Sequence, residues 1–291
     1  MRVLITGARG QVGYELLRLA PDGFDVVGLG SAELDIADAS AVVREVSRLQ
    51  PQLIVNAAAY TAVDKAESEP ERAYAVNRDG PENLGLVAEQ LGIPVLHIST
   101  DYVFAGDATQ PYREGDPTGP TGVYGASKLA GEQALADACA RHLILRTSWV
   151  FGVHGNNFVK TMLRLGRERE QLTVVADQQG CPTSAASIAW ALWALVEQYR
   201  REGKLRWALY HYSGTPACSW HAFAVEIFRQ AQQAGLLARQ PVVHAITTAQ
   251  YPTPARRPAW SVLDGSLLRQ AHGIESADWR VELAAVLAEL S

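Results

Sequence analysis

Hydrophobic residues in the first half of the chain form short runs that alternate with longer amphipathic segments. The runs that predict strands are Val3–Thr6, Asp25–Leu29, Leu53–Ala59, Val95–Ser99 and Leu143–Val150. The segments with helical spacing are Tyr14–Leu19, Ala41–Leu49, Glu71–Leu91 (one or two helices) and Tyr124–Ala136. Continuous apolar strands that alternate with helices are typical of a parallel sheet covered on both faces. The pattern therefore predicts an α/β fold with a doubly wound, Rossmann-like parallel sheet.

The pattern changes after about residue 150. Helices are predicted at Asn156–Arg169, Ser187–Tyr199 and Asp278–Leu290, whereas Thr247–Pro258 is too rich in proline for regular structure. We therefore expect one domain over residues 1–150. Residues 151–291 are expected to form mainly a smaller C-terminal substrate lobe, interleaved with the end of the sheet.

Three glycines lie between the first predicted strand and the first predicted helix. Gly7, Gly10 and Gly13 have the spacing G-x-x-G-x-x-G. Such a turn lets a pyrophosphate approach the N-terminus of the helix, where free N–H groups and the helix dipole favour an anion. Any sharp strand-to-helix turn also favours glycine, so a purely structural turn is the alternative. The position of the loop favours a dinucleotide-binding domain over residues 1–150.

The end of the second predicted strand bears on the choice of cofactor. An NAD site usually has Asp or Glu there, but this chain has Gly30 and Ser31, and Arg9 lies within the glycine loop. A missing acid and a nearby cation favour the 2′-phosphate of NADPH, with NADH as a second cofactor. The alternative is that Arg9 is a solvated surface residue.

Composition excludes several classes of function. The formal net charge of −5 argues against binding to nucleic acid or to an anionic membrane. The three cysteines and seven histidines are scattered, which argues against a metal site or a disulfide framework. No apolar stretch reaches the ~20 residues of a membrane span, and the N-terminus lacks a secretory signal. We therefore expect the protein in the cytoplasm.

Tyr124 and Lys128 are four residues apart in a segment with good helix formers, so they share one face of the predicted helix. An ammonium beside a phenol lowers the pKa of the phenol, and such a phenol can protonate a carbonyl oxygen during reduction. The remaining donors of the lysine can bind cofactor ribose hydroxyls. The alternative is an amphipathic tyrosine and a snorkelling lysine on an ordinary helix.

Together with the glycine loop, several longer segments carry a resemblance to a known family. They are Asn56–Glu71 (NAAAYTAVDKAESEPE), Ser99–Phe104 (STDYVF), Val123–Glu132 (VYGASKLAGE), Arg146–Phe151 (RTSWVF), Gly155–Leu163 (GNNFVKTML) and Tyr251–Pro258 (YPTPARRP). These segments resemble the dTDP-4-dehydrorhamnose reductases, which are extended short-chain dehydrogenases/reductases. The resemblance runs nearly from end to end.

The resemblance implies roles for individual residues. Tyr124 would be the acid, Lys128 its tuner and ribose anchor, and Thr100 the hydroxyl that binds the keto oxygen of the sugar. Ser99 is the neighbouring hydroxyl, but strand alternation points it to the other face. The further substrate positions are Asp101, Trp149 and Arg257.

The resemblance also implies a set of cofactor positions. Besides the glycines and Arg9, they are Gln11 and Val12 at the pyrophosphate, Asp35 and Ile36 at the adenine, and Ala59, Tyr60 and Thr61 along the cofactor channel. Structural alternatives stay open for four positions. Trp149 is expected in the core or at the sugar, Asp101 in a turn cap or at the sugar, and Asn156 and Asn157 at a helix cap.

Some relatives hold Mg²⁺ with glutamates at a dimer contact. Glu15 and Glu289 match two of those positions, but the third is Ala186. We therefore predict no metal and leave open whether the protein is a monomer or a homodimer.

The reaction implied by the resemblance is reduction of the C4 keto group of dTDP-4-dehydro-L-rhamnose by NADPH, giving dTDP-L-rhamnose. The partner is thus a small dTDP-sugar bound by the C-terminal lobe. One alternative is a non-catalytic, NADP-binding regulatory subunit that resembles the β subunit of methionine adenosyltransferase. Another is a different nucleotide-sugar ketoreductase or an epimerase.

Overall fold

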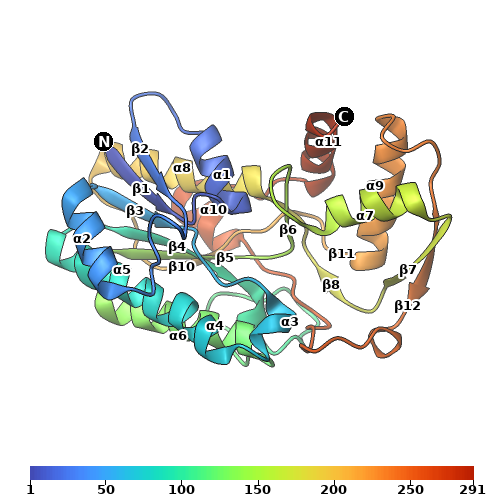
Figure 1. The fold of residues 1–291 in the computed structure, drawn as a ribbon, viewed down its shortest axis with the longest axis horizontal. Coiled ribbons are helices and arrows are strands. Elements are labelled where there is room, and N and C mark those ends of the chain that lie inside the picture. The colour runs from blue at the N-terminus through green and yellow to red at the C-terminus, as the bar shows by residue number, and fades with distance from the viewer.

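Six parallel strands form the central sheet, in the order β10-β5-β4-β3-β1-β2 (Figure 1). The computed structural model describes residues 1–291. The strands are β1 (Arg2–Thr6), β2 (Asp25–Leu29), β3 (Leu53–Asn56), β4 (Val95–Thr100), β5 (His142–Thr147) and β10 (Leu209–His211). The predicted doubly wound α/β fold is confirmed.

Helices cover both faces of this sheet, which explains why its strands are apolar throughout. On one face lie α1 (Gln11–Arg18), α8 (Ala185–Glu202) and α10 (Ser266–His272); on the other lie α2 (Ala39–Leu49), α5 (Gly80–Leu91) and α6 (Val123–Ala138) (Figure 1). Strand alternation divides the side chains of β1 between two cores. Val3 and Ile5 pack with α1 and α8, whereas Leu4 packs with α2 and α5.

Most predicted elements appear with small shifts at their ends, and the larger differences have local causes. The predicted strand Leu53–Ala59 ends at Asn56, where the chain turns towards the glycine loop. The predicted strand Leu143–Val150 divides into β5 and β6 (Val150–Phe151), because Trp149 has a left-handed backbone with φ 47°. The helical segment over 71–91 consists of α4 (Pro70–Tyr74), a π-helical turn η1 (Ala75–Asp79) and α5.

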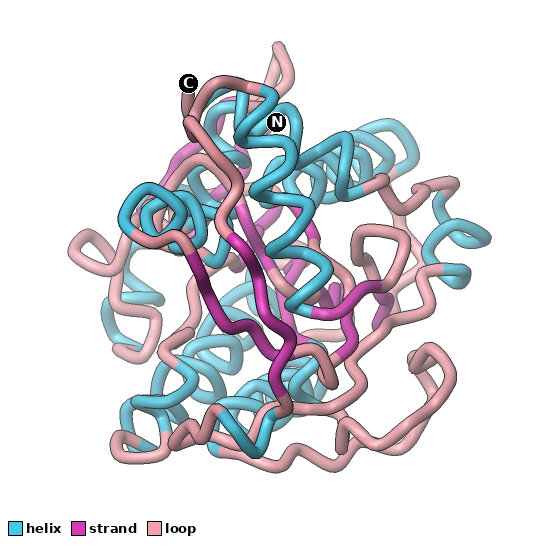
Figure 2. The backbone as a smooth tube through the Cα atoms, turned by 90° about the vertical axis from the view of Figure 1, so that its right-hand side faces the viewer, coloured by secondary structure: helices cyan, strands magenta, loops and turns pink.

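A second core lies to the right of the sheet in Figure 1. It is built from α7 (Phe158–Glu168), α9 (Trp220–Gln233), α11 (Trp279–Glu289) and the parallel pair β7 (Gln171–Val175) and β12 (Val242–Ile246). Figure 2 shows this part facing the viewer, with its strands side by side. Three elements that follow residue 150, α8, β10 and α10, pack instead with the central sheet. Where the chain divides into domains therefore stays a prediction.

Short elements complete the chain. They are α3 (Val63–Ala66), η2 (Asp101–Val103), β8 (Gln179–Gly180), β9 (Thr183–Ser184), β11 (Cys218–Ser219) and η3 (Thr248–Gln250). The proline-rich stretch 247–258 has no regular structure beyond η3, as predicted. No helix combines the length and the apolar character that a membrane crossing requires.

Candidate active site

The predicted site residues gather at the carboxyl ends of the central strands. β1 has β2 on one side and β3 on the other, so the order of the strands reverses there. Open α/β sheets bind ligands in the crevice at such a point, outside the carboxyl ends of the strands. The glycine loop follows β1, the segment 57–61 follows β3, and Thr100 and Asp101 lie at the end of β4.

The glycine loop is shaped by close backbone approaches. Gly7 has φ 70°, and a Cβ there would lie 2.5 Å from the amide nitrogen of Ala58. A Cβ at Gly13 would lie 2.1 Å from the carbonyl oxygen of Gly7. Gly10 precedes α1, and no side chain caps the N-terminus of that helix. An open helix N-terminus beside a backbone without side chains fits a dinucleotide pyrophosphate.

The segment 152–157 lies against this loop, a contact that the sequence did not reveal. Asn157 caps α7 through Lys160 N–H and also donates from Nδ2 to Gln11 Oε1 at 2.9 Å. His154 Nε2 lies 3.0 Å from the carbonyl oxygen of Arg9. Gln11 is thus held from outside the glycine loop, by a residue more than a hundred positions away.

The structure contradicts the reasoning that no carboxylate stands at the end of β2. Glu33 turns back, and its Oε2 accepts a hydrogen bond from Gly30 N–H at 3.0 Å, while Oε1 pairs with the guanidinium of Arg9. The acid is three residues later than the usual position, so a search at Gly30 and Ser31 missed it. Arg9, whose side chain is 73% exposed, therefore forms a surface ion pair with Glu33, and a phosphate would have to compete with that pair.

The remaining cofactor positions lie on the segments that follow β2 and β3. Asp35 pairs with Arg72 at 3.1 Å, while Ile36 is buried in the core under α2 and α5. The backbone of Tyr60, between Ala59 and Thr61, is clamped by Asn77, whose Oδ1 and Nδ2 bond the N–H and C=O of Tyr60 at 2.8 and 3.0 Å. Asn77 also donates to Ser127 on α6, so it ties this segment to the helix of Tyr124. It lies on the π-helical turn, which no sequence pattern predicts.

Tyr124 and Thr100 come together as predicted from the resemblance. Burial raises the pKa of the Tyr124 phenol to about 12, although the neighbouring Thr100 hydroxyl acts to lower it. The ring of Tyr102 packs edge-on against Tyr124, with centroids 5.5 Å apart. Ser99 faces away and donates to Glu132 at 2.5 Å. The strand alternation thus separates the two hydroxyls.

The predicted effect of Lys128 on Tyr124 is wrong for the structure as it stands. Burial raises the pKa of Tyr124, and Thr100 rather than Lys128 is the group that acts to lower it. Lys128 is buried and points to β4, where Nζ donates to the carbonyl oxygen of Ile98 at 2.7 Å. Burial lowers the pKa of Lys128 to about 8. Helical spacing placed the two residues on one face, but the long lysine side chain reaches past the phenol.

Asp101 is a buried carboxyl beside the Thr100 hydroxyl, whose Oγ1 donates to Asp101 Oδ1 at 2.9 Å. Its Oδ2 is buried without a partner. Burial raises the pKa of Asp101 to about 6, although the nearby hydroxyls of Ser261 and Thr100 act to lower it. An unpartnered buried oxygen is costly and fits a group that meets a ligand.

Trp149 lies between two surfaces. Its ring stacks on Trp220 with centroids 3.5 Å apart, and a Cβ at Gly180 would lie 2.4 Å from the indole. The Trp149 ring is thus packed closely from both neighbours but is not fully buried. A left-handed backbone at a tryptophan is an outlier that packing must support. Trp220 was not singled out from the sequence.

Arg257 meets Asp64 instead of standing free. Its Nη2 lies 2.8 Å from Asp64 Oδ2, while Nη1 is buried without a partner. The charge of Arg257 also acts on the buried phenol of Tyr102, which neighbours Tyr124. The proline-rich segment thereby brings a cation to the site from the far end of the chain.

The glutamates that match metal-binding positions in some relatives meet an arginine here. Arg18 pairs with Glu15 at 2.6 Å and lies 3.6 Å from Glu289. A guanidinium between two carboxylates opposes a divalent cation, and Ala186 offers no ligand. No group of three or more His, Cys, Asp or Glu side chains is arranged to hold a metal ion.

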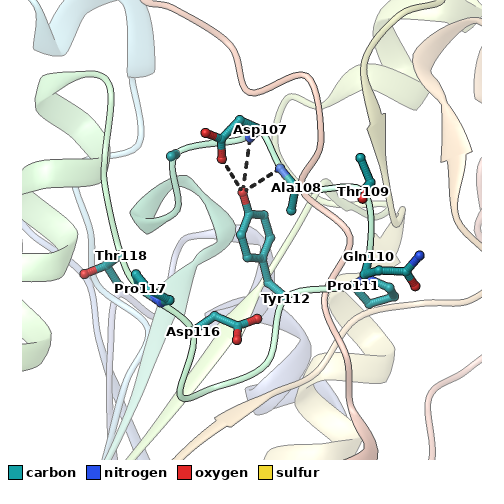
Figure 3. A pocket seen from close by; sticks show the side chains of 10 residues that line it. Asp107, Ala108, Thr109, Gln110, Pro111, Tyr112, Asp116, Pro117 and Thr118 are labelled. Atoms are coloured by element: carbon teal, nitrogen blue, oxygen red, sulfur yellow. Dashed lines mark hydrogen bonds between the residues drawn. The ribbon is translucent and has the colours of Figure 1, made fainter.

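A separate depression lies over the loop 105–118 (Figure 3). Its centre is Tyr112, whose hydroxyl oxygen accepts from the N–H groups of Gly106, Asp107 and Ala108. None of the predicted site residues lines it. These bonds hold the loop that follows η2.

The whole chain, residues 1–291, matches the sequence model of the RmlD substrate binding domain. The chain belongs to this family. Among its relatives, dTDP-4-dehydrorhamnose reductase of Aggregatibacter actinomycetemcomitans is 46% identical over 281 residues, which are 96% of each chain. The enzyme of the same name from Sinorhizobium fredii is 47% identical and covers 96% of this chain and 94% of its own.

Solved structures that superimpose on this chain support its membership of the RmlD family. A dTDP-4-dehydrorhamnose reductase from Clostridium acetobutylicum superimposes with a TM-score of 0.93 at 37% identity, covering 100% of this chain and 99% of its own. One from Bacillus anthracis, solved in complex with NADP, gives 0.91 at 38% identity and covers 99% of both chains. The predicted recognition of the family is confirmed.

Asp101 supplies a pH-dependent prediction for this RmlD-family protein. Because its pKa is raised to about 6 from an ordinary value of 3.8, the folded state binds the proton more tightly than the unfolded state does. The contribution to the free energy of unfolding is complete below pH ~4 and is lost as the pH rises through ~6, by about 2–3 kcal/mol. Asp101→Asn should therefore gain stability relative to the wild type between these pH values, as measured by urea unfolding. A difference that does not change with pH would contradict it.

Proposed function

We propose that this chain is a dTDP-4-dehydrorhamnose reductase, which reduces the C4 keto group of dTDP-4-dehydro-L-rhamnose with NADPH to give dTDP-L-rhamnose. The proximity of Tyr124 on α6 to Thr100 at the carboxyl end of β4 supports the proposal, in a chain whose relatives bear that name over nearly their whole length. Reductases of a biosynthetic route draw on cytoplasmic NADPH, so we propose the cytoplasm as the compartment. The assembly is a monomer or a homodimer.

The residues present fit the cofactor. The open N-terminus of α1 and the glycine loop would hold the pyrophosphate, with Gln11 and Val12 at its side. Ile36 and Asp35 would border the adenine, and Lys128 would donate to a ribose hydroxyl. When bound, NADPH supplies the hydride for C4. A cradle in which a Cβ at Gly7 would meet the backbone supports this assignment.

Residues of the chain supply the proton that the keto oxygen receives. Thr100 donates a hydrogen bond to the keto oxygen, and Tyr124 gives its phenolic proton to that oxygen as negative charge develops there. A phenol with a pKa of about 12 is fully protonated at neutral pH, so the acid is ready before the reaction. An alkoxide is a stronger base than a phenolate, so the transfer is favourable. Asp101, Trp149 and Arg257 would position the sugar diphosphate.

The direct test is NADPH consumption by the purified protein on addition of the keto sugar nucleotide, with NMR identification of dTDP-L-rhamnose. UDP-linked 4-keto sugars and NADH complete the panel. A regulatory subunit would bind NADPH without turnover, and an epimerase would change the sugar without net consumption. Either result would overturn the proposal.

Tyr124→Phe should lower kcat by ~10²–10⁴-fold, the usual contribution of general acid catalysis, because only the proton donor is lost. The NADPH dissociation constant and the melting temperature should stay close to the wild type. Tyr199→Phe on α8, far from the site, is the matched control and should keep full turnover. A folded Tyr124→Phe variant with normal kcat would remove Tyr124 from its role.

Arg257→Ala should weaken binding of the dTDP-sugar by ~1.5–3 kcal/mol, the range for hydrogen bonds to charged groups. Binding of NADPH should hardly change. Asp64→Asn, which releases the arginine from its 2.8 Å partner, should tighten sugar binding or leave it unchanged. Calorimetric titration with both ligands measures the effects. Equal losses for both ligands in the Arg257→Ala variant would show a structural role instead.

The pair of Arg9 and Glu33 should set the cofactor preference. An exposed arginine–phosphate contact is worth ~1 kcal/mol, so we expect NADPH to be preferred by roughly five- to tenfold. Arg9→Ala should abolish most of this preference. Glu33→Gln should increase it, because it frees Arg9 and removes a charge that repels the 2′-phosphate.

The measurement is the ratio of kcat/KM for the two cofactors at fixed ionic strength. The exposed pair of Arg48 and Glu45 on α2 supplies the matched controls, Arg48→Ala and Glu45→Gln. A Gly30→Asp variant is a poor test, since its Cβ would lie 2.9 Å from atoms of both Arg9 and Glu33. A ratio that is unchanged in both site variants would make the pair a surface ion pair without influence on the cofactor.

A further inference from the structure

Lys128 has a second buried neighbour that the proposed chemistry does not use. Besides its bond to Ile98, its Nζ lies 3.2 Å from Nε2 of His97 on β4. Lys128 is 2% exposed and His97 is fully buried. Which of these two nitrogens carries the hydrogen between them therefore depends on the other bonds that each group makes.

Asn56 settles the hydrogen bonds of His97. Its Oδ1 accepts from Ala58 N–H at 3.1 Å and from the Thr6 hydroxyl at 2.7 Å. Turning the amide over would place its NH₂ group against the N–H of Ala58, so the orientation is determined. Nδ2 of Asn56 is then the group that faces His97 Nδ1 at 3.0 Å, and it acts as the donor.

The tautomer of His97 follows from this bond. A neutral imidazole has one N–H, and Nδ1 is occupied as an acceptor, so the hydrogen is on Nε2. Burial holds the pKa of His97 well below its usual value, which excludes the doubly protonated ring at neutral pH. The Nε2–H group therefore points at Nζ of Lys128.

An ammonium group has three donors and no acceptor, so it cannot receive this N–H. A neutral amine can, through its lone pair. It then donates one hydrogen to the carbonyl oxygen of Ile98 and keeps one for a ligand. Every group in the series Thr6, Asn56, His97 and Lys128 is satisfied only when the lysine is uncharged.

The charged groups around Lys128 do not reverse this preference for the neutral amine. Glu132, one turn further along α6, attracts the proton to the lysine. Its carboxylate already accepts from Arg146 at 2.6 and 2.8 Å and from Ser99 at 2.5 Å, so its charge is largely matched. The other titratable group on this face of α6 is Tyr124, which is neutral.

We propose that His97 is a positioning residue for Lys128: held by Asn56 as the Nε2–H tautomer, it favours the neutral amine and lets Lys128 exchange a proton close to physiological pH. The inference rests on the proposed function in that Lys128 serves the same active site. Burial acts in the same direction, since it lowers the pKa of Lys128. The pH above which activity falls then depends on Asn56 of β3 and His97 of β4 as well as on Lys128 of α6.

Two substitutions reverse the donor and acceptor roles in these hydrogen bonds and leave Tyr124 and Lys128 unchanged. Asn56→Asp has the same shape, but its carboxylate accepts from His97 Nδ1–H, so Nε2 becomes an acceptor for the ammonium. His97→Gln provides an amide that can turn its oxygen towards Nζ. Both variants should raise the pKa of Lys128 by about one unit or more, which is tenfold or more in the proton-binding constant.

The primary measurement is NMR of the protein without ligands. Correlation of ring nitrogens and carbon-bound hydrogens should show hydrogen on Nε2 of His97 in the wild type and on Nδ1 in the Asn56→Asp variant. Titration of the lysine side-chain signal gives the pKa of Lys128 directly. The alkaline limit of kcat/KM, which reports groups of the free enzyme, should move upward by the same amount.

His272→Gln is the control, because this histidine bonds Gln198 away from the site and should leave every value unchanged. An Nδ1–H tautomer in the wild type, or an unshifted Lys128 pKa in both folded variants, would overturn the inference. A merely structural role for His97 would alter stability without shifting that pKa. A protein with the expected NMR results but no turnover would refute the reductase proposal and leave this one standing.

Discussion

The close docking of α6 onto backbone is the constraint on which the active site depends. A Cβ at Gly131 would lie 1.8 Å from the carbonyl oxygen of Asn77, and one at Gly125 would lie 2.1 Å from that of Tyr102. Only glycine permits such an approach, so the helix sits directly on the π-helical turn and on η2. That seating brings Tyr124 to Thr100 and lets Lys128 reach under β4.

Burial has opposite consequences for the charged groups that this docking encloses. Arg146 and Glu132 form a buried ion pair joined by two hydrogen bonds. Asp101 and Lys128 lack equivalent partners, and their pKa values move towards neutrality. The paired residues Arg146 and Glu132 thus lie close in the fold to Asp101 and Lys128. The hydrogen-bond partners available to Asp101 and Lys128 leave the effect of burial on their pKa values uncompensated.

Much of the fold was predictable because its signals are local. Apolar runs located the five strands of the first half, and the glycine loop located the nucleotide crevice. The resemblance of segments such as STDYVF and VYGASKLAGE named Thr100, Tyr124 and Lys128. Local signals failed where a side chain turns back or crosses to another element. Glu33 returns to Gly30, and Asn77 clamps Tyr60 from a helical turn of unusual hydrogen bonding.

The sequence by itself determined the parallel sheet, its nucleotide loop and the family, because periodicity, turn chemistry and long motifs are properties of neighbouring residues. Only the tertiary structure decided the pKa values of the two residues that the sequence singled out on α6. Tyr124 and Lys128 are one helical turn apart, yet burial raises the pKa of the phenol and lowers that of the amine. Their neighbours lie on β4 and on the turn that follows it. Desolvation and hydrogen bonding depend on everything that surrounds a group, and spacing along one helix does not contain that information.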